Sequence, residues 1–181
     1  LVNQYYDLVT DFYEFGWGHS FHFATRRRGE SFEESIRRHE HYLALHLGLQ
    51  PGQRVLDVGC GVGGPMRAIS HFAAVDVVGV NNNAYQIERG EVHNKAAGVE
   101  ERCSFLKADF MKIPLSDESF DGAYQIAATC HAPDRVPVFS EIFRVLKSGK
   151  CFVGYEWCVT DLYDAENPEH RRIAHGIEVG D

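Results

Sequence analysis

The 181-residue sequence lacks several features that mark particular classes of protein. No apolar run reaches the roughly 20 residues that a membrane-spanning helix needs. Positive charge is also scarce, with 18 Lys and Arg against 26 Asp and Glu and a net charge of −8. Because phosphate binding requires clustered Lys and Arg, this balance disfavours a nucleic-acid partner. The single basic run, Arg26 to Arg28, has several glutamates beside it and is typical of a solvated loop.

Paired cysteines and paired metal ligands are missing as well. The five cysteines form an odd number without a Cys-x-x-Cys pair, which predicts free thiols in a reducing, cytoplasmic compartment. His39 and His41 are two residues apart on a predicted helix, so they face different directions. The sequence also contains no His-Glu-x-x-His motif. We therefore expect no metal site.

The spacing of apolar residues predicts one domain of alternating strands and helices. A capping box at Ser31 and Glu34 begins a helix that runs to Leu47 and ends at Gly48. Strands are predicted over 54–58, 75–80, 103–107, 120–126 and 150–156, and further helices over 65–72, 84–97 and 136–146. This alternation predicts an α/β fold with a doubly wound, mostly parallel sheet, which binds ligands at the carboxyl ends of its strands.

A glycine-dense turn follows the first predicted strand. Its Gly59-x-Gly61-x-x-Gly64 pattern fits a nicotinamide-dinucleotide fingerprint, but that fold needs an acid about 20 residues later, where this chain has three asparagines. Asp57 precedes the first glycine by two residues, where a carboxylate can hold an ammonium group. A strand followed by Asp-x-Gly-x-Gly-x-Gly is typical of the S-adenosylmethionine loop of methyltransferases. We therefore predict S-adenosylmethionine as the cofactor, bound by Asp57, Gly59, Cys60, Gly61 and Gly63.

Polar residues after the later strands extend this predicted site. Asn81, with Asn82 beside it, follows the second strand where a ribose diol would lie, and an amide can both donate and accept hydrogen bonds. A plain asparagine turn is the alternative. After the third strand, Asp109 is predicted near the adenine amino group and Phe110 near its ring face.

The segment 129–133 follows the fourth strand and faces the reactive end of the cofactor. We predict His131 as a polar contact near the transferred methyl group. Cys130 precedes it, but adjacent side chains in an extended loop point apart, so a covalent Cys-His mechanism is disfavoured.

Residues 1–25 form an aromatic lid segment. They interleave aromatic side chains with Asp, Glu and His, an expensive composition for a core. Aromatic faces attract cations, and methyl transfer from a sulfonium creates a cationic product. We expect a lid segment and helix over residues 1–48 and an S-adenosylmethionine-binding domain over 49–181. The second part lacks the final antiparallel hairpin that usually closes the sheet of such methyltransferases, so we expect a truncated sheet.

Several stretches together resemble the sterol 24-C-methyltransferase family, which has a Rossmann-like methyltransferase fold. They are residues 5–18, 20–23, 56–65, 128–133 and 155–161. The resemblance implies methyl transfer to C24 of the side-chain double bond of a Δ24 sterol, in sterol biosynthesis. It also implies that Tyr6 and Gln86 contact the cofactor. The chain departs from the family pattern at Ala127, where the family has Glu, and at Phe15, where it usually has Tyr.

The same resemblance suggests roles in catalysis and a place of action. Tyr13 and Trp17 are candidates to hold a carbocation, and Glu14, His22 and His131 are candidate bases. Sterols are nearly insoluble, so we expect peripheral attachment to the endoplasmic reticulum or to lipid droplets, through the aromatic residues 17–23. The sequence is compatible with a homo-oligomer. The alternatives are another small-molecule methyltransferase, of tocopherol, phosphobase or fatty-acid type, and an inactive cofactor-binding paralogue.

Overall fold

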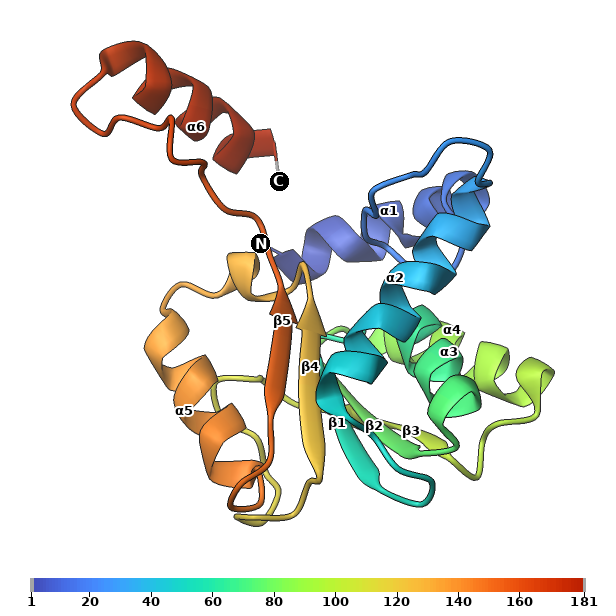
Figure 1. The fold of residues 1–181 in the computed structure, drawn as a ribbon. Coiled ribbons are helices and arrows are strands. Elements are labelled where there is room, and N and C mark those ends of the chain that lie inside the picture. Colours follow the sequence, from blue (N-terminus) through green and yellow to red (C-terminus); the bar gives the residue numbers. More distant parts are fainter. Residues whose placement is uncertain (1, 181) are drawn as a thin grey trace.

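A single parallel sheet organises the protein. A computed structural model describes residues 2–180, and its five strands lie in the order β3-β2-β1-β4-β5 (Figure 1). The strands are β1 (Arg54–Val58), β2 (Asp76–Asn81), β3 (Cys103–Lys107), β4 (Gly122–Ile126) and β5 (Phe152–Tyr155). The predicted fold class is confirmed. The strand order reverses between β1 and β4, which makes the carboxyl ends of these two strands the expected place for a ligand.

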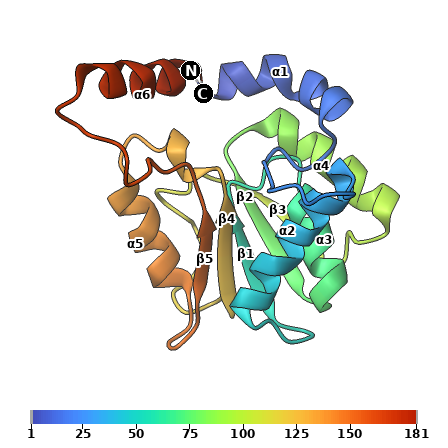
Figure 2. The same cartoon turned by 45° about the horizontal axis from the view of Figure 1, so that its top comes forward.

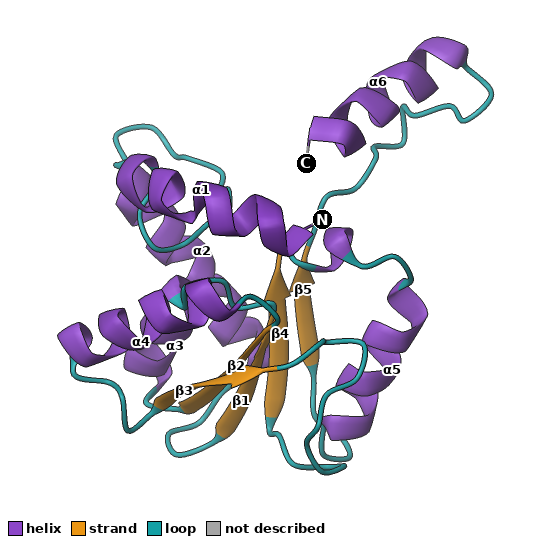
Figure 3. Ribbon diagram, turned by 180° about the vertical axis from the view of Figure 1, so that it is seen from behind, coloured by secondary structure: helices purple, strands orange, loops and turns teal. Residues whose placement is uncertain are grey.

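Helices cover both faces of the sheet (Figure 3). One face carries α2 (Phe32–Leu47), α3 (Gly64–Ala73) and α4 (Ala84–Ala97), and the other carries α5 (Arg135–Val145). Because side chains alternate along a strand, Val55 packs toward Met66 and Ile69 of α3, whereas Leu56 packs toward Ile142 of α5. All of these side chains are buried, so two apolar clusters hold the sheet between its helices.

The predicted start and end of α2 are confirmed. The Ser31 hydroxyl accepts a hydrogen bond from the Glu34 backbone N–H at 3.1 Å, and the Glu34 carboxylate accepts one from the Ser31 N–H at 2.7 Å. At the other end, Gly48 takes a left-handed conformation with φ of +61°. The helix packs against α3, β4 and β5, so it forms part of the layer that covers the sheet. The division into a lid segment with its helix (1–48) and an S-adenosylmethionine-binding domain (49–181) stays a prediction. Residues 1 and 181 of these two ranges lie outside the described residues.

Two helices that the pattern analysis did not predict lie over the carboxyl edge of the sheet (Figure 2). They are α1 (Val2–Gly16) and α6 (Pro168–Gly180). In the described part of the chain no strand follows β5, and α6 is found there instead. The segment Thr129–His131 is a short 3₁₀ helix, η1. The prediction of an extended loop at this place was therefore wrong. No helix within residues 2–180 is long and apolar enough to cross a membrane.

Candidate cofactor and substrate site

A cavity opens at the carboxyl edge, next to the point where the strand order reverses. It brings together most of the residues predicted to bind the cofactor, although they come from four separate segments of the chain. Its lining consists of Tyr6, Phe21, Gly59, Gly61, Asn81, Asn82, Asn83, Gln86, Asp109, Phe110, Met111, Ile126, Ala127, Ala128, His131 and Pro133. A smaller cavity beside it is lined by Asp57, Gly59, Cys60 and Gly61, together with His19, Phe21, His22, Val62, Pro65 and Ile126. Gly63 lines neither of these two cavities.

The glycine loop follows a path that side chains would block. Gly59 has φ of +78°, and a Cβ there would lie 2.4 Å from the Cβ of Ala128 at the end of β4. Gly63 is the N-cap residue before α3, and a Cβ there would lie 2.8 Å from the Phe105 ring. The loop therefore needs glycine at both positions to pack against its own fold. The Cys60 thiol is buried, which raises its pKa well above the ordinary value.

Asp57 is a buried carboxyl group at the small cavity. It is 2% exposed and accepts a hydrogen bond from the Tyr124 hydroxyl at 2.8 Å. Burial raises the pKa of Asp57 to about 7, and the hydrogen bond from Tyr124 only partly opposes this shift. An ammonium group in the small cavity would compensate the buried negative charge.

Asn81 holds the turn in place. Its amide nitrogen donates to the Gly61 carbonyl at 3.0 Å and to the Gln86 side chain at 2.9 Å, and its amide oxygen accepts from the Asn83 N–H at 2.9 Å. The side chain of Asn81 therefore has a structural role in the glycine loop. Asn82 also lines the cavity and is exposed.

Asp109 and Phe110 lie across the cavity from this turn, after β3. One oxygen of Asp109 accepts from the Met111 N–H at 2.8 Å, and the residue is exposed. Phe110 is half-buried. Both line the large cavity, and their predicted contact with an adenine stays a prediction.

Helix α1 is attached to the sheet domain by side chains of the same site. The Asn83 amide donates to Asp7 at 2.9 Å, and the Gln86 amide donates to the Thr10 hydroxyl at 3.2 Å. The Tyr6 hydroxyl lies 3.0 Å from Nε2 of His131. Polar residues of the predicted cofactor site thus also bind the lid segment.

Glu156 is a site residue to which the analysis of the sequence gave no role. Its carboxylate accepts from the Thr129 hydroxyl at 2.7 Å and from the Cys130 N–H at 2.9 Å. These bonds join the segment after β5 to η1 and orient His131 toward Tyr6. The motif at residues 155–161 marked this region, but its contact with η1 depends on the fold.

The four candidate catalytic residues lie in different surroundings. His131 lines the large cavity and His22 the small one, where Nε2 of His22 lies 3.4 Å from the buried Glu40 carboxylate. Tyr13 packs its ring against Phe21, with the ring centroids 5.2 Å apart. Neither Tyr13 nor Glu14 is among the lining residues of the two cavities.

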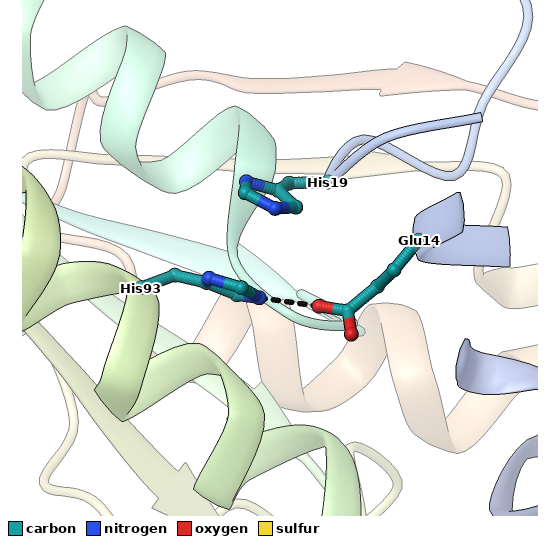
Figure 4. Close-up of side chains that lie close together, drawn as sticks. All are labelled: Glu14, His19 and His93. Carbon is teal, nitrogen blue, oxygen red and sulfur yellow. Dashed lines mark hydrogen bonds and ion pairs between the residues drawn. The ribbon is translucent and has the colours of Figure 1, made fainter. Parts of the chain in front are cut away.

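Glu14 is instead bound to α4. Its carboxylate pairs with His93 (Figure 4). It also pairs with Arg89 at 2.6 Å. Burial alone would raise the pKa of Glu14, but the hydrogen bonds from His93 and Arg89 outweigh it and lower that pKa. A lowered pKa weakens Glu14 as a base, so the geometry favours His22 and His131 over it.

Comparison with known proteins gives consistent results. A methyltransferase-domain family model matches residues 56–153. The cycloartenol-C-24-methyltransferase of Arabidopsis thaliana is 61% identical over 181 residues, covering 100% of this chain and 54% of the plant protein. The sterol 24-C-methyltransferase of Saccharomyces cerevisiae is 54% identical over 180 residues, covering 99% of this chain and 47% of the yeast protein. The chain thus spans about half the length of these curated relatives.

A solved structure shares the fold. Geranyl diphosphate C-methyltransferase from Streptomyces coelicolor A3(2) aligns over 98% of this chain and 71% of that protein, with a TM-score of 0.81 and 19% identity. That likeness concerns the fold alone. The resemblance to sterol 24-C-methyltransferases is confirmed by the sequence relatives, and the family model over residues 56–153 shows that the chain belongs to the methyltransferase domain family.

Proposed function

We propose that this chain is the cofactor-binding part of an S-adenosylmethionine-dependent enzyme that methylates C24 of a Δ24 sterol. The observation that carries the proposal is the cavity at the carboxyl edge, in a chain 54% and 61% identical to two sterol C24-methylating relatives. Its glycine loop, Asp57 and the asparagine turn lie where this fold binds ligands.

The residues present fit S-adenosylmethionine. Asp57 offers a buried carboxylate for the ammonium group, and Asn82 is free to face the ribose. Asp109 and Phe110 offer an acceptor and a ring face for the adenine. When bound, the cofactor supplies an electrophilic methyl group on a sulfonium. The protein would act mainly by positioning, which can contribute ~7–11 kcal/mol toward the barrier of such a reaction.

The remaining lining residues face the substrate side. Phe21, with Tyr13 behind it, offers aromatic faces to a carbocation. His131, held by Tyr6 and by the Glu156-bound η1, is the base candidate on the large cavity. His22 is the second candidate, paired with Glu40 at the small cavity.

We also propose that the enzyme collects its substrate as a peripheral protein at the endoplasmic reticulum or a lipid droplet. We place this lipid contact on α1 rather than on the segment 17–23. Trp17 packs against Phe23 and Phe32, with ring centroids 4.8 and 5.5 Å apart. Leu8, Phe12 and Phe15 of α1 instead are 72%, 72% and 96% exposed. They lie on one side of the helix, which is typical of an interfacial helix.

The direct test is incubation of the full-length protein with labelled S-adenosylmethionine and a panel of Δ24 sterols. We expect label in the sterol. Label in a tocopherol-type phenol or a phosphobase instead would overturn the sterol assignment. Calorimetric binding of S-adenosylmethionine without any labelled product would identify an inactive cofactor-binding paralogue.

A further inference from the structure

Glu14, His19 and His93 form a cluster beside the proposed cofactor site, and only His19 of the three also lines the small cavity. Glu14 lies on α1, His19 on the loop that follows it, and His93 on α4 (Figure 4). One ligand atom from each residue lies within 4.8 Å of the other two. The rings of His19 and His93 are stacked with their centroids 3.9 Å apart, and the Glu14 carboxylate is bonded to His93.

Although the sequence alone predicted no metal site, we propose that Glu14, His19 and His93 bind a zinc ion and thereby fasten α1 to α4. Two imidazole nitrogens and a carboxylate oxygen are a donor set that Zn²⁺ uses in proteins, with a fourth position left to water. Mg²⁺ and Ca²⁺ prefer oxygen ligands alone, so the two imidazoles favour zinc over these ions.

The cluster needs side-chain movements to bind the ion. Zinc ligands lie at about 2.0–2.2 Å from the metal, so their donor atoms must come closer together than 4.8 Å. His19 is largely exposed, and its ring must rotate out of its stack on His93 to bring a nitrogen toward the other two donors. Zn²⁺ at Nε2 of His93 would take the place of the hydrogen between this nitrogen and Glu14, and that hydrogen would move to Nδ1 of a neutral ring or leave to solvent from a protonated one.

The surroundings both support and limit this site. The Arg89 guanidinium binds the other Glu14 oxygen at 2.6 Å, as the outer partners of metal-ligating carboxylates do. Partial burial and the positive charge of nearby Arg67 and Arg89 lower the pKa of His19. The same arginine charges repel a cation, so we expect moderate affinity.

Zinc binding to this cluster would affect the loop between α1 and α2, which carries His19 and Phe21. His19 also lines the small cavity with Asp57, and Phe21 lines both cavities. A metal that holds His19 against α4 would therefore set the position of the loop that borders the proposed cofactor site. The site itself does not depend on the proposed sterol chemistry.

Titration of the protein with Co²⁺, followed by visible absorption, and with Zn²⁺, followed by calorimetry, tests the proposal. We expect one equivalent of each ion, with the intense absorption of four-coordinate Co²⁺. His93→Gln should weaken binding at least about tenfold, because it removes one ligand, and Glu14→Gln should do the same. Hydrogen exchange in α1 should slow on addition of Zn²⁺ in the wild type and stay unchanged in His93→Gln.

His46→Gln is the matched control, since His46 is an exposed histidine in the last turn of α2. It should bind zinc as the wild type does. Absence of saturable binding in the wild type, or equal affinity in His93→Gln and the wild type, would overturn the proposal. Circular dichroism of each variant separates loss of a ligand from loss of the fold.

Discussion

At the scale of single residues, the Asp57 carboxyl group combines complete burial with a pKa of about 7, well above its ordinary 3.8. The folded, ligand-free protein keeps a proton there that the unfolded chain releases between these two values. This group's contribution to stability is therefore full below about pH 3.8 and is lost as the pH rises through about 7. A cationic ligand needs the opposite, deprotonated form.

The affinity for S-adenosylmethionine should consequently depend on pH. We expect it to rise about tenfold per pH unit between about pH 5 and about pH 7 and to level off above, because binding must release the Asp57 proton. Calorimetry across this range measures it. Asp57→Asn should bind more weakly above pH 7, by ~1.5–3 kcal/mol, and should lose the pH dependence. A flat profile in the wild type would contradict this role for Asp57.

Ala127 is the second residue with a consequence that can be measured. It lines the large cavity with φ of +50°, and its N–H donates to the Tyr155 carbonyl at 2.8 Å. The sterol 24-C-methyltransferase family, which this chain resembles, has Glu at this position. If that acid contributes acid–base catalysis, Ala127→Glu should raise turnover at least about tenfold with little change in cofactor affinity. Ala127→Gln is the matched control, and an equal gain in that variant would show that the carboxylate is not the cause.

At the scale of elements, the loop between α1 and α2 meets the start of α3 at one close contact, between His19 and Gly64. A Cβ on Gly64 would lie 2.1 Å from the His19 carbonyl oxygen, so the loop rests directly on the first turn of α3. Gly64→Ala should displace this loop at a cost of ~1–3 kcal/mol. Proteolysis between α1 and α2 should become faster. Gly16→Ala is the control, because a Cβ there meets nothing within 4 Å, and equal protection in both variants would refute the contact.

The sheet elements could be predicted because each has a local signal. The capping box defined α2, and short apolar runs between turn residues defined all five strands. β1 and β3 have the predicted ends, and the ends of the other strands differ by at most two residues, as at β5, which is Phe152–Tyr155 against the predicted 150–156. Helix α1 was not predicted although Leu8, Phe12 and Phe15 have a helical spacing. Aromatic and acidic residues are interleaved with them, and that composition was interpreted as a lid.

The site could be located but not fully resolved from the sequence. Asn81 was correctly placed at the end of β2, yet its hydrogen-bonding atoms are occupied by Gly61, Asn83 and Gln86. Which partner an amide chooses depends on distances that only the fold supplies. The clustered residues Glu14, His19 and His93 follow no spacing motif, since Glu14 and His93 are 79 positions apart in the sequence. Only the fold brings them together.

At the scale of the whole molecule, the carboxyl edge of the sheet carries the cavities and also much of the exposed apolar surface. Besides the α1 residues, Leu162 is 85% exposed, and Ile173 and Ile177 of α6 are 48% and 57% exposed. Both helices lie over this edge (Figure 2). A substrate drawn from a lipid surface would therefore enter at the side of the protein where the proposed reaction takes place.

Vesicle flotation with neutral, sterol-containing vesicles measures this contact, since the net charge of −8 disfavours docking on anionic lipid. Phe12→Ser/Phe15→Ser should lower the bound fraction at least about tenfold, because burial of one phenylalanine contributes roughly 1.5–3 kcal/mol. Trp17→Ser/Phe21→Ser should instead lower the melting temperature, because these rings pack against Phe32 and Tyr13. Flotation that persists in the α1 variant would move the contact elsewhere on the protein. Failure of the wild type to float would favour a soluble substrate.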